Sequence, residues 1–291
     1  MFLLSLLTDP GFRANKIRII RPIEAGPYTL STPYGELGDR APWALLTDGI
    51  TVGNQIRPHH NTLGNAHDGY WRVRNNINSV EVLMHREEGE KSRIQITCDT
   101  RNNAVYGCGE VDALLCAITP IAGLIDDPGM IAMDTQPSLA DMASLTITWR
   151  EMITQVKVGR KRPACPPGYN CALTFASIYV KDVETNQTLQ YEYVTSDSRN
   201  MRFSNSEFAY VPHQFLGIAD SAEAYTPVSR IPVTRFIDIL PRLREIITSN
   251  EKILSPRLDT KKILMASWGP FNNGSARVVV SLDSMDILVE T

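Results

Sequence analysis

The sequence predicts an all-β protein, built as a β-sandwich of two antiparallel sheets with one short external helix. Short runs rich in β-branched and aromatic residues recur along the chain, and Gly, Pro, Asn and Asp separate them. This pattern is typical of β-sandwiches and barrels. A single segment instead has apolar residues at helical spacing.

The expected strands are runs in which polar and apolar residues alternate, because alternate residues of a strand face the same side. The helix is expected from about residue 240 to residue 248, with Pro241 in its first turn, where proline is tolerated. Its apolar stripe must lie on the outside of a sheet or cover an open end. The strands are expected at residues 16–23, 80–85, 92–98, 144–149, 154–158, 173–183, 188–196, 261–267 and 276–289.

The length of the chain, 291 residues, suits one large β-domain. Residues 1–15 are expected to form an N-terminal arm, and residues 16–291 a single β-sandwich domain. The turn-rich stretch at 126–141 does not have the composition of a flexible linker.

Charge and hydropathy exclude two classes of partner. The net charge is −3, with 29 basic and 32 acidic residues, so the chain does not attract polyanions at long range and no nucleic-acid binding is predicted. No apolar run approaches the roughly 18–20 residues that span a bilayer, so no membrane insertion is predicted. The opening MFLLSLL is apolar but lacks the basic start and the cleavage site of a complete secretion signal.

The five cysteines favour an extracellular protein. Cys165 and Cys171 bracket a short Pro/Gly turn, which suits a loop-closing disulfide, and Cys98 and Cys108 bracket an apparent hairpin tip. Cys116 is left over. The alternative is that all five are reduced and mostly buried in a cytosolic protein. None has C-x-x-C spacing, so a zinc site is not expected.

The stretch RPHHNTLGNAHDGYW at 57–71 is the first candidate binding segment. His67 and Asp68 supply directional hydrogen bonds, and Tyr70 or Trp71 offers a flat apolar face for a pyranose ring. The alternative is an ordinary polar surface loop before a strand. The spacing of the histidines matches no zinc-binding frame, so no metal and no cofactor is predicted.

A pair of carboxylates, Glu110 and Asp112, is the candidate catalytic site. GEVDALL resembles the E-x-D-x-x-E strand of laminarinase-type glycosidases, in which alternating acids line a cleft. The third position of that motif is Leu115 here. Because glycoside hydrolysis requires two carboxyl groups across the scissile bond, an enzyme would need a third acid from elsewhere, such as Glu151 or Glu192.

The C-terminal part of the chain resembles the family 12 glycoside hydrolases, which have a concanavalin-like jelly roll. The resemblance rests on the amphipathic segment at 234–249 and on the run SWGPFNNG at 267–274, which aligns with the family motif G-F-E-P-W-x-G-G. The acid/base glutamate of the family falls on Gly269, and its nucleophile, in a strand of the form E-I-M-I-W, falls on Leu145. The resemblance therefore implies a jelly roll without catalytic glutamates.

The predicted function is non-catalytic, lectin-like carbohydrate binding by a secreted protein, with a glycan or polysaccharide as the partner. The alternatives are a glycan-active hydrolase or lyase that uses Glu110 and Asp112, and a structural subunit, because jelly rolls also assemble into shells. A homo-oligomer stays open. The predicted ligand contacts are His67, Asp68, Tyr70, Trp71, Trp268 and Asn272.

Overall fold

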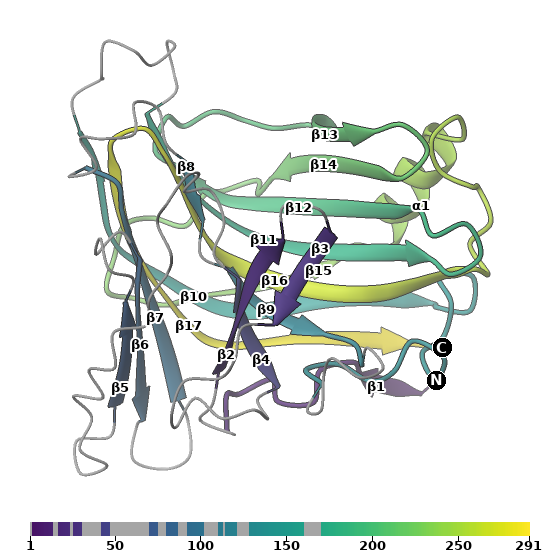
Figure 1. The fold of residues 1–291 in the computed structure, drawn as a ribbon, viewed down its shortest axis with the longest axis horizontal. Coiled ribbons are helices and arrows are strands. Elements are labelled where there is room, and N and C mark those ends of the chain that lie inside the picture. The colour runs from purple at the N-terminus through teal and green to yellow at the C-terminus, as the bar shows by residue number, and fades with distance from the viewer. Residues whose placement is uncertain are drawn as a thin grey trace.

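The computed structural model describes residues 2–13, 17–23, 26–30, 42–46, 70–74, 80–86, 92–101, 110–112, 114–120, 128–159 and 170–291. These residues form a seven-stranded sheet, a ten-stranded sheet and one α-helix (Figure 1). The fold class expected from the sequence, an all-β sandwich of jelly-roll type, is confirmed.

The smaller sheet has the strand order β15-β10-β17-β7-β6-β5, and β1 also pairs with β17. Its strand pairs are antiparallel. Its strands are β1 (Leu3–Ser5), β5 (Tyr70–Arg74), β6 (Val80–Arg86), β7 (Ser92–Asp99), β10 (Ser144–Val158), β15 (Val233–Asp238) and β17 (Ala276–Glu290).

The larger sheet has the order β13-β14-β12-β11-β16-β9-β4-β2-β3, and β8 pairs with β16. Two pairs, β12–β14 and β2–β4, are parallel, which departs from the purely antiparallel sheets expected. β14 lies between β12 and its hairpin partner β13, and it runs parallel to β12 and antiparallel to β13. The strands are β2 (Ile17–Ile23), β3 (Gly26–Leu30), β4 (Trp43–Leu46), β8 (Glu110–Asp112), β9 (Leu114–Ile118), β11 (Cys171–Asp182), β12 (Thr188–Asp197), β13 (Ser206–Val211), β14 (Phe215–Ser221) and β16 (Lys261–Asn273).

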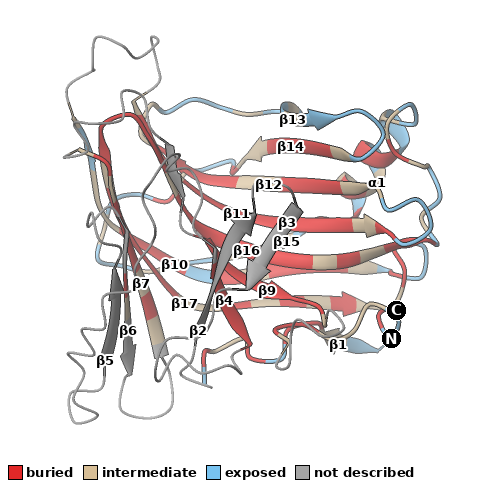
Figure 2. Cartoon of the chain, viewed as in Figure 1, coloured by how far each residue is buried: buried red, intermediate tan, exposed pale blue. Residues whose placement is uncertain are grey.

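The main hydrophobic core lies between the two sheets, where the long central strands are mostly buried (Figure 2). Alternation explains which side chains enter it, because every second residue of a strand faces the opposite sheet. On β17 these are Val278, Val280, Leu282, Met285, Ile287 and Val289, all at most 1% exposed.

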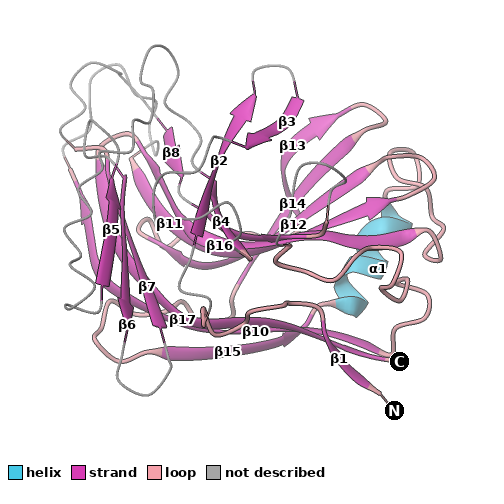
Figure 3. Ribbon diagram, turned by 60° about the horizontal axis from the view of Figure 1, so that its bottom comes forward, coloured by secondary structure: helices cyan, strands magenta, loops and turns pink. Residues whose placement is uncertain are grey.

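The helix α1 (Leu240–Ser249) confirms the helix expected at about 240–248, with Pro241 at its start. Its buried residues, Leu240, Leu243, Ile246 and Ile247, belong to the same core cluster as residues of both sheets. Of the two placements that the sequence allowed, the apolar stripe covers an open end of the sandwich (Figure 3). Within the described ranges, no helix is both long and apolar enough to cross a membrane.

The N-terminal segment joins the sandwich. β1 pairs with β17, Leu6 and Phe12 are at most 1% exposed, and the Asp9 carbonyl accepts a hydrogen bond of 2.7 Å from Nε1 of buried Trp43. Residues 2–13 therefore contribute three apolar side chains to the core between the sheets. The division into an arm at 1–15 and a domain at 16–291 stays a prediction.

Strand β10 is longer than expected, because the predicted strands at 144–149 and 154–158 are one strand. Its pairing with β17 shifts at Arg150/Glu151 and again at Ile153/Gln155. The first shift leaves Asp283 of β17 without an opposite residue, and the second leaves Thr154 of β10, so each is a β-bulge. The sequence between the shifts includes the polar residues Arg150 and Glu151, so it does not read as a strand.

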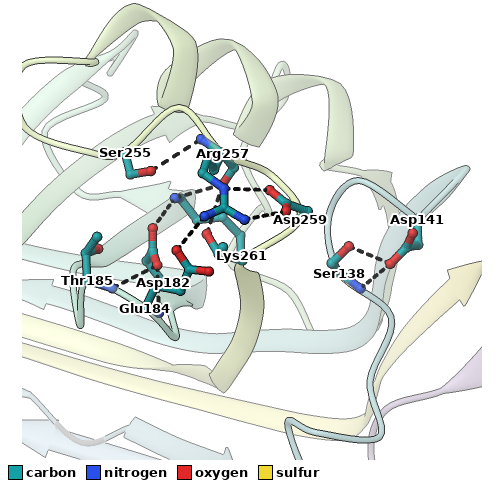
Figure 4. Close-up of polar contacts among 10 residues, drawn as sticks. Ser138, Asp141, Asp182, Glu184, Thr185, Ser255, Arg257, Asp259 and Lys261 are labelled. Atoms are coloured by element: carbon teal, nitrogen blue, oxygen red, sulfur yellow. Dashed lines mark hydrogen bonds and ion pairs between the residues drawn. The ribbon is translucent and has the colours of Figure 1, made fainter.

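A polar network ties the C-terminal end of β11 to the start of β16 (Figure 4). Nζ of Lys261 lies 2.7 Å from Oδ2 of Asp182, and both side chains are at most 3% exposed. Oδ1 of Asp182 accepts hydrogen bonds from the backbone N–H groups of Glu184 and Thr185. At its solvent-facing side, Arg257 forms ion pairs with Glu184 and Asp259.

Candidate functional site

Two of the predicted ligand contacts, Trp268 and Asn272, lie inside the protein. Both are 0% exposed. Nε1 of Trp268 donates a hydrogen bond of 2.8 Å to Oε2 of Glu151, and Nδ2 of Asn272 donates bonds to the carbonyls of Cys98 and Ala276. A sugar therefore cannot reach either side chain in this structure, because alternation along β16 places them on the face that packs against the smaller sheet.

Of the other four predicted ligand contacts, two belong to the edge strand of the smaller sheet. His67 and Asp68 fall outside the described residues. Tyr70 and Trp71 begin the edge strand β5, where they pair with His85 and Met84 of β6. Their role in ligand binding stays a prediction.

The candidate catalytic pair lies in β8, at the end of β16. Glu110 is opposite Asn273 and Asp112 is opposite Phe271. Glu151 and Glu192, each considered as the additional acid of an enzyme, lie on opposite faces of the larger sheet. Glu192 is half-buried on the outer face, where it accepts a hydrogen bond of 2.7 Å from Gln190, whereas Glu151 is buried between the sheets. Catalysis by Glu110 and Asp112 stays a prediction.

The cysteines are only partly covered by the described residues. Cys98 and Cys171 are buried at the ends of β7 and β11. Their expected partners, Cys108 and Cys165, fall outside the described residues, so both disulfides stay predictions.

The outer face of the larger sheet carries a second apolar cluster. Phe175 and Tyr179 of β11 are 5% and 7% exposed, so this face does not offer its central aromatic rings to solvent. The cluster consists of Ala44, Leu114, Cys116, Ile118, Phe175, Tyr179, Val194, Ala219 and Met265.

The outer face of the smaller sheet is different, because it is polar and open around one exposed aromatic ring. Phe236 of β15 is 70% exposed. Thr148 of β10 is directly opposite Phe236, and Asp286 of β17 is opposite Thr148, so the three residues form one row across the strands. The next row on the same face contains Thr234, Arg150 and Ser284. We call these six residues the Phe236 surface. It combines one flat apolar ring with hydroxyl, carboxyl and guanidinium groups on rigid strands.

The carboxyl group of Asp286 is held in place within this surface. Its Oδ1 accepts hydrogen bonds from Oγ of Ser5 at 2.6 Å and from the backbone N–H of Ile287 at 2.7 Å. Burial raises the pKa of Asp286 above its ordinary value, and these two hydrogen bonds offset only part of the rise.

A charged cluster continues the surface toward β5. The Asp283 carboxylate lies 2.6 Å from Nε of Arg93 and 3.3 Å from Nε of Arg150. Tyr70 belongs to the same cross-strand row, because it pairs with His85, which pairs with Arg93. The structure thus brings the predicted candidate Tyr70 into register with polar residues that the sequence analysis did not select.

Sequence reasoning missed Phe236 because its segment was assigned to a helical pattern. The residues VTRFID form β15, in which burial alternates along the strand. The residue types do not alternate in this strand, because its half-buried row contains Arg235 and its exposed row contains Phe236, so the sequence offers no strand signal.

No protein-family model matches the chain, and no curated protein sequence matches it. Solved structures similar to it include the family 11 xylanase of Neocallimastix patriciarum, at 9% identity and a TM-score of 0.44, covering 84% of this chain and 100% of that one. Others are endoglucanase 3 of family 12 from Trichoderma harzianum (9%, 0.40, 84% and 98%) and the family 12 xyloglucanase of Bacillus licheniformis (10%, 0.37, 84% and 100%). These values describe a distant likeness in the arrangement of strands.

Proposed function

We propose that the protein is a non-catalytic carbohydrate-binding β-sandwich that acts outside the cell and binds a polysaccharide across the Phe236 surface. The observation that carries this proposal is the exposure of Phe236, at 70%, on a rigid strand among groups that form hydrogen bonds. An aromatic ring with hydrogen-bonding groups beside it supplies both the stacking face and the polar partners that a sugar site needs.

The binding mechanism follows from the chemistry of a pyranose. One face of the ring carries C–H groups, which stack on an aromatic side chain, and its edge carries hydroxyls that need directional partners. Phe236 supplies the stacking face. Thr148, Asp286 and Arg150 lie in the same or the next cross-strand row and supply acceptors and donors.

The carboxyl groups at this surface support binding rather than hydrolysis. Glycoside hydrolysis requires one carboxyl to give a proton and a second to attack or activate water. Asp283 lies between two guanidinium groups, and Asp286 accepts a hydrogen bond from Ser5. Neither arrangement leaves a pair of carboxyls facing each other across a bound sugar.

A binding assay with matched variants tests the proposal. Affinity electrophoresis against a panel of polysaccharides is expected to show retardation of the wild type, and Phe236→Ala is expected to weaken binding roughly tenfold or more. The control is Tyr210→Ala, which removes another exposed aromatic ring, 46% exposed, from the edge strand β13 of the larger sheet. Equal loss in both variants, or no binding by the wild type, contradicts the proposal.

The assay also separates the alternative functions. Release of reducing sugar by the wild type, abolished in Glu110→Gln, identifies a hydrolase. Sedimentation of large particles without any ligand, together with no binding to the panel, identifies an assembly subunit.

A further inference from the structure

We infer that Asn186 is an attachment site for an N-linked glycan and that Asn273 is not one. The chain has two triplets of the form Asn-x-Ser/Thr, at 186–188 and 273–275, and this form is the acceptor sequence for N-glycosylation in secreted proteins. Modification at Asn186 goes beyond the proposed carbohydrate binding, and it rests on the proposed function only in the extracellular location. Exposure and local structure separate the two triplets.

Asn186 is exposed in the turn that joins β11 to β12. Its φ of 62° is in the left-handed region, which asparagine adopts more readily than most residues. Two backbone hydrogen bonds close the turn: the N–H of Asn186 donates to the carbonyl of Asp182 at 2.9 Å, and the N–H of Asp182 donates to the carbonyl of Gln187 at 2.8 Å. A glycan on the Asn186 side chain therefore leaves these bonds intact.

The side chain of Asp182, and not that of Asn186, holds this turn. Oδ1 of Asp182 accepts hydrogen bonds from the N–H groups of Glu184 at 3.0 Å and Thr185 at 3.1 Å (Figure 4). The side chain of Asn186 has no hydrogen-bond partner among the described residues. Its amide nitrogen is therefore available for modification without the loss of a structural contact.

Thr188 supplies the hydroxyl that the acceptor sequence requires at its third position. It is the first residue of β12 and is half-buried. Turn geometry explains the asparagine but not this hydroxyl. Asn200 and Asn205 also have positive φ, of 57° and 50°, but the residue two positions after each of them is charged and carries no hydroxyl.

Asn273 is enclosed by the sheet. It is 7% exposed, and it is opposite Cys171 of β11 and Glu110 of β8. Ser275, the third residue of its triplet, is 6% exposed, and its N–H donates a hydrogen bond of 3.0 Å to Oδ1 of Asn170. A glycan is bulky and polar, so at this position it would separate packed strands. The folded protein can therefore carry a glycan at Asn186 but not at Asn273.

The modification is a transfer from a lipid-linked oligosaccharide, which a transferase of the secretory pathway supplies. Nδ2 of Asn186 forms a bond to the anomeric carbon of the first sugar, and the bond from that carbon to the pyrophosphate oxygen breaks. The amide gives up one proton, and the lipid pyrophosphate leaves. In the folded protein, Val183 of the same turn is 52% exposed, and the C–H face of the sugar offers cover for such an apolar side chain.

The test is secretion of the full chain by a eukaryotic cell, followed by treatment with peptide N-glycosidase. This enzyme removes N-linked glycans and converts the linked asparagine to aspartate. The wild type is expected to lose the mass of one glycan, and peptide mass spectrometry is expected to find the conversion at position 186 and an unmodified Asn273.

Matched variants locate the site without altering the turn. Thr188→Val keeps a β-branched residue at the start of β12 and is expected to abolish the mass loss, whereas Thr188→Ser keeps the hydroxyl and is expected to retain it. Ser275→Ala breaks the second triplet and is expected to leave the mass loss unchanged.

The outcomes separate the modification from the proposed function. A secreted wild type without a glycan, a glycan at Asn273, or a glycan that persists in Thr188→Val overturns the inference. Affinity electrophoresis of the same preparations measures polysaccharide binding independently. Binding by a protein without a glycan overturns the modification alone, whereas a protein glycosylated at Asn186 that binds no polysaccharide supports the modification and overturns the proposed carbohydrate binding.

Discussion

Nε1 of Trp268 donates a hydrogen bond of 2.8 Å to Oε2 of Glu151, and this bond joins the larger sheet to the smaller one inside the core. The Glu151 side chain is fully buried and also accepts hydrogen bonds from Oγ1 of Thr195 and Oγ1 of Thr226. Nε of Arg235 lies 3.9 Å away. A buried carboxylate is tolerated only when such partners replace water.

Trp268→Phe is therefore expected to destabilise the protein more than its size change alone explains. The control is Trp149→Phe, because Trp149 is also buried at 1% exposure but its Nε1 has no hydrogen-bond partner among the described residues. Both variants lose a similar volume of packed side chain, but only Trp268→Phe removes a hydrogen-bond donor from a buried carboxyl group. We expect its free energy of unfolding to fall by about 1.5–3 kcal/mol more than that of the control. Equal losses in urea denaturation contradict this role.

Acid is expected to destabilise the protein through Asp182. Burial raises the pKa of Asp182, but the hydrogen bonds from Lys261 and from the N–H groups of Thr185 and Glu184 outweigh it and lower the pKa from 3.8 to about 2. Because the folded pKa lies below the unfolded one, this contribution is complete above about pH 4 and is lost as the pH falls toward 2.

The contribution amounts to roughly 2 kcal/mol. Unfolding free energies measured between pH 5 and pH 2 should show it, and the conservative variant Asp182→Asn should be less stable at pH 5 and lose less on acidification. Parallel pH profiles for wild type and variant would show that another carboxylate dominates.

Secretion predicts two disulfides, Cys98–Cys108 and Cys165–Cys171. Peptide mapping without reduction should find both, and the uncrosslinked cysteine should be Cys116. Detection of all five cysteines as thiols in protein purified from its native source contradicts the prediction and places the protein in a reducing compartment.

The acid pair in β8 is expected to be dispensable. Glu110→Gln and Asp112→Asn should bind polysaccharide as the wild type does, because their strand pairs with the end of β16 and not with any strand of the Phe236 surface. Isothermal titration of each variant with the best polysaccharide of the panel measures this. A loss of binding in both variants moves the site to the larger sheet.

The sequence predicted the parts of the fold that depend on local patterns. Alternation located β12 and β17, and helical spacing with Pro241 located α1 within one residue of its end. These signals are reliable because they depend only on which face of its own strand or helix each residue occupies. The strands that it did not predict include β1, β3, β4, β13, β14 and β15. β13 is an edge strand whose residues are mostly exposed on both faces, so it has no clear alternation.

The candidate site was harder to predict, because it depends on which strands become neighbours. Phe236, Thr148 and Asp286 are far apart in the sequence and meet only through the register of β15, β10 and β17. Conversely, Trp268 and Asn272 follow the strand predicted at 261–267, but β16 continues through Asn273 and buries both. Nε1 of Trp268 donates to Glu151 and Nδ2 of Asn272 donates to backbone carbonyls, which no local pattern indicates.

The most direct test of the central claim is the position of a bound oligosaccharide in a crystal structure of the complex. The account predicts a pyranose ring stacked on Phe236, with its hydroxyls toward Thr148 and Asp286. An oligosaccharide bound on the outer face of the larger sheet, over Phe175 and Tyr179, or at β8, would contradict it.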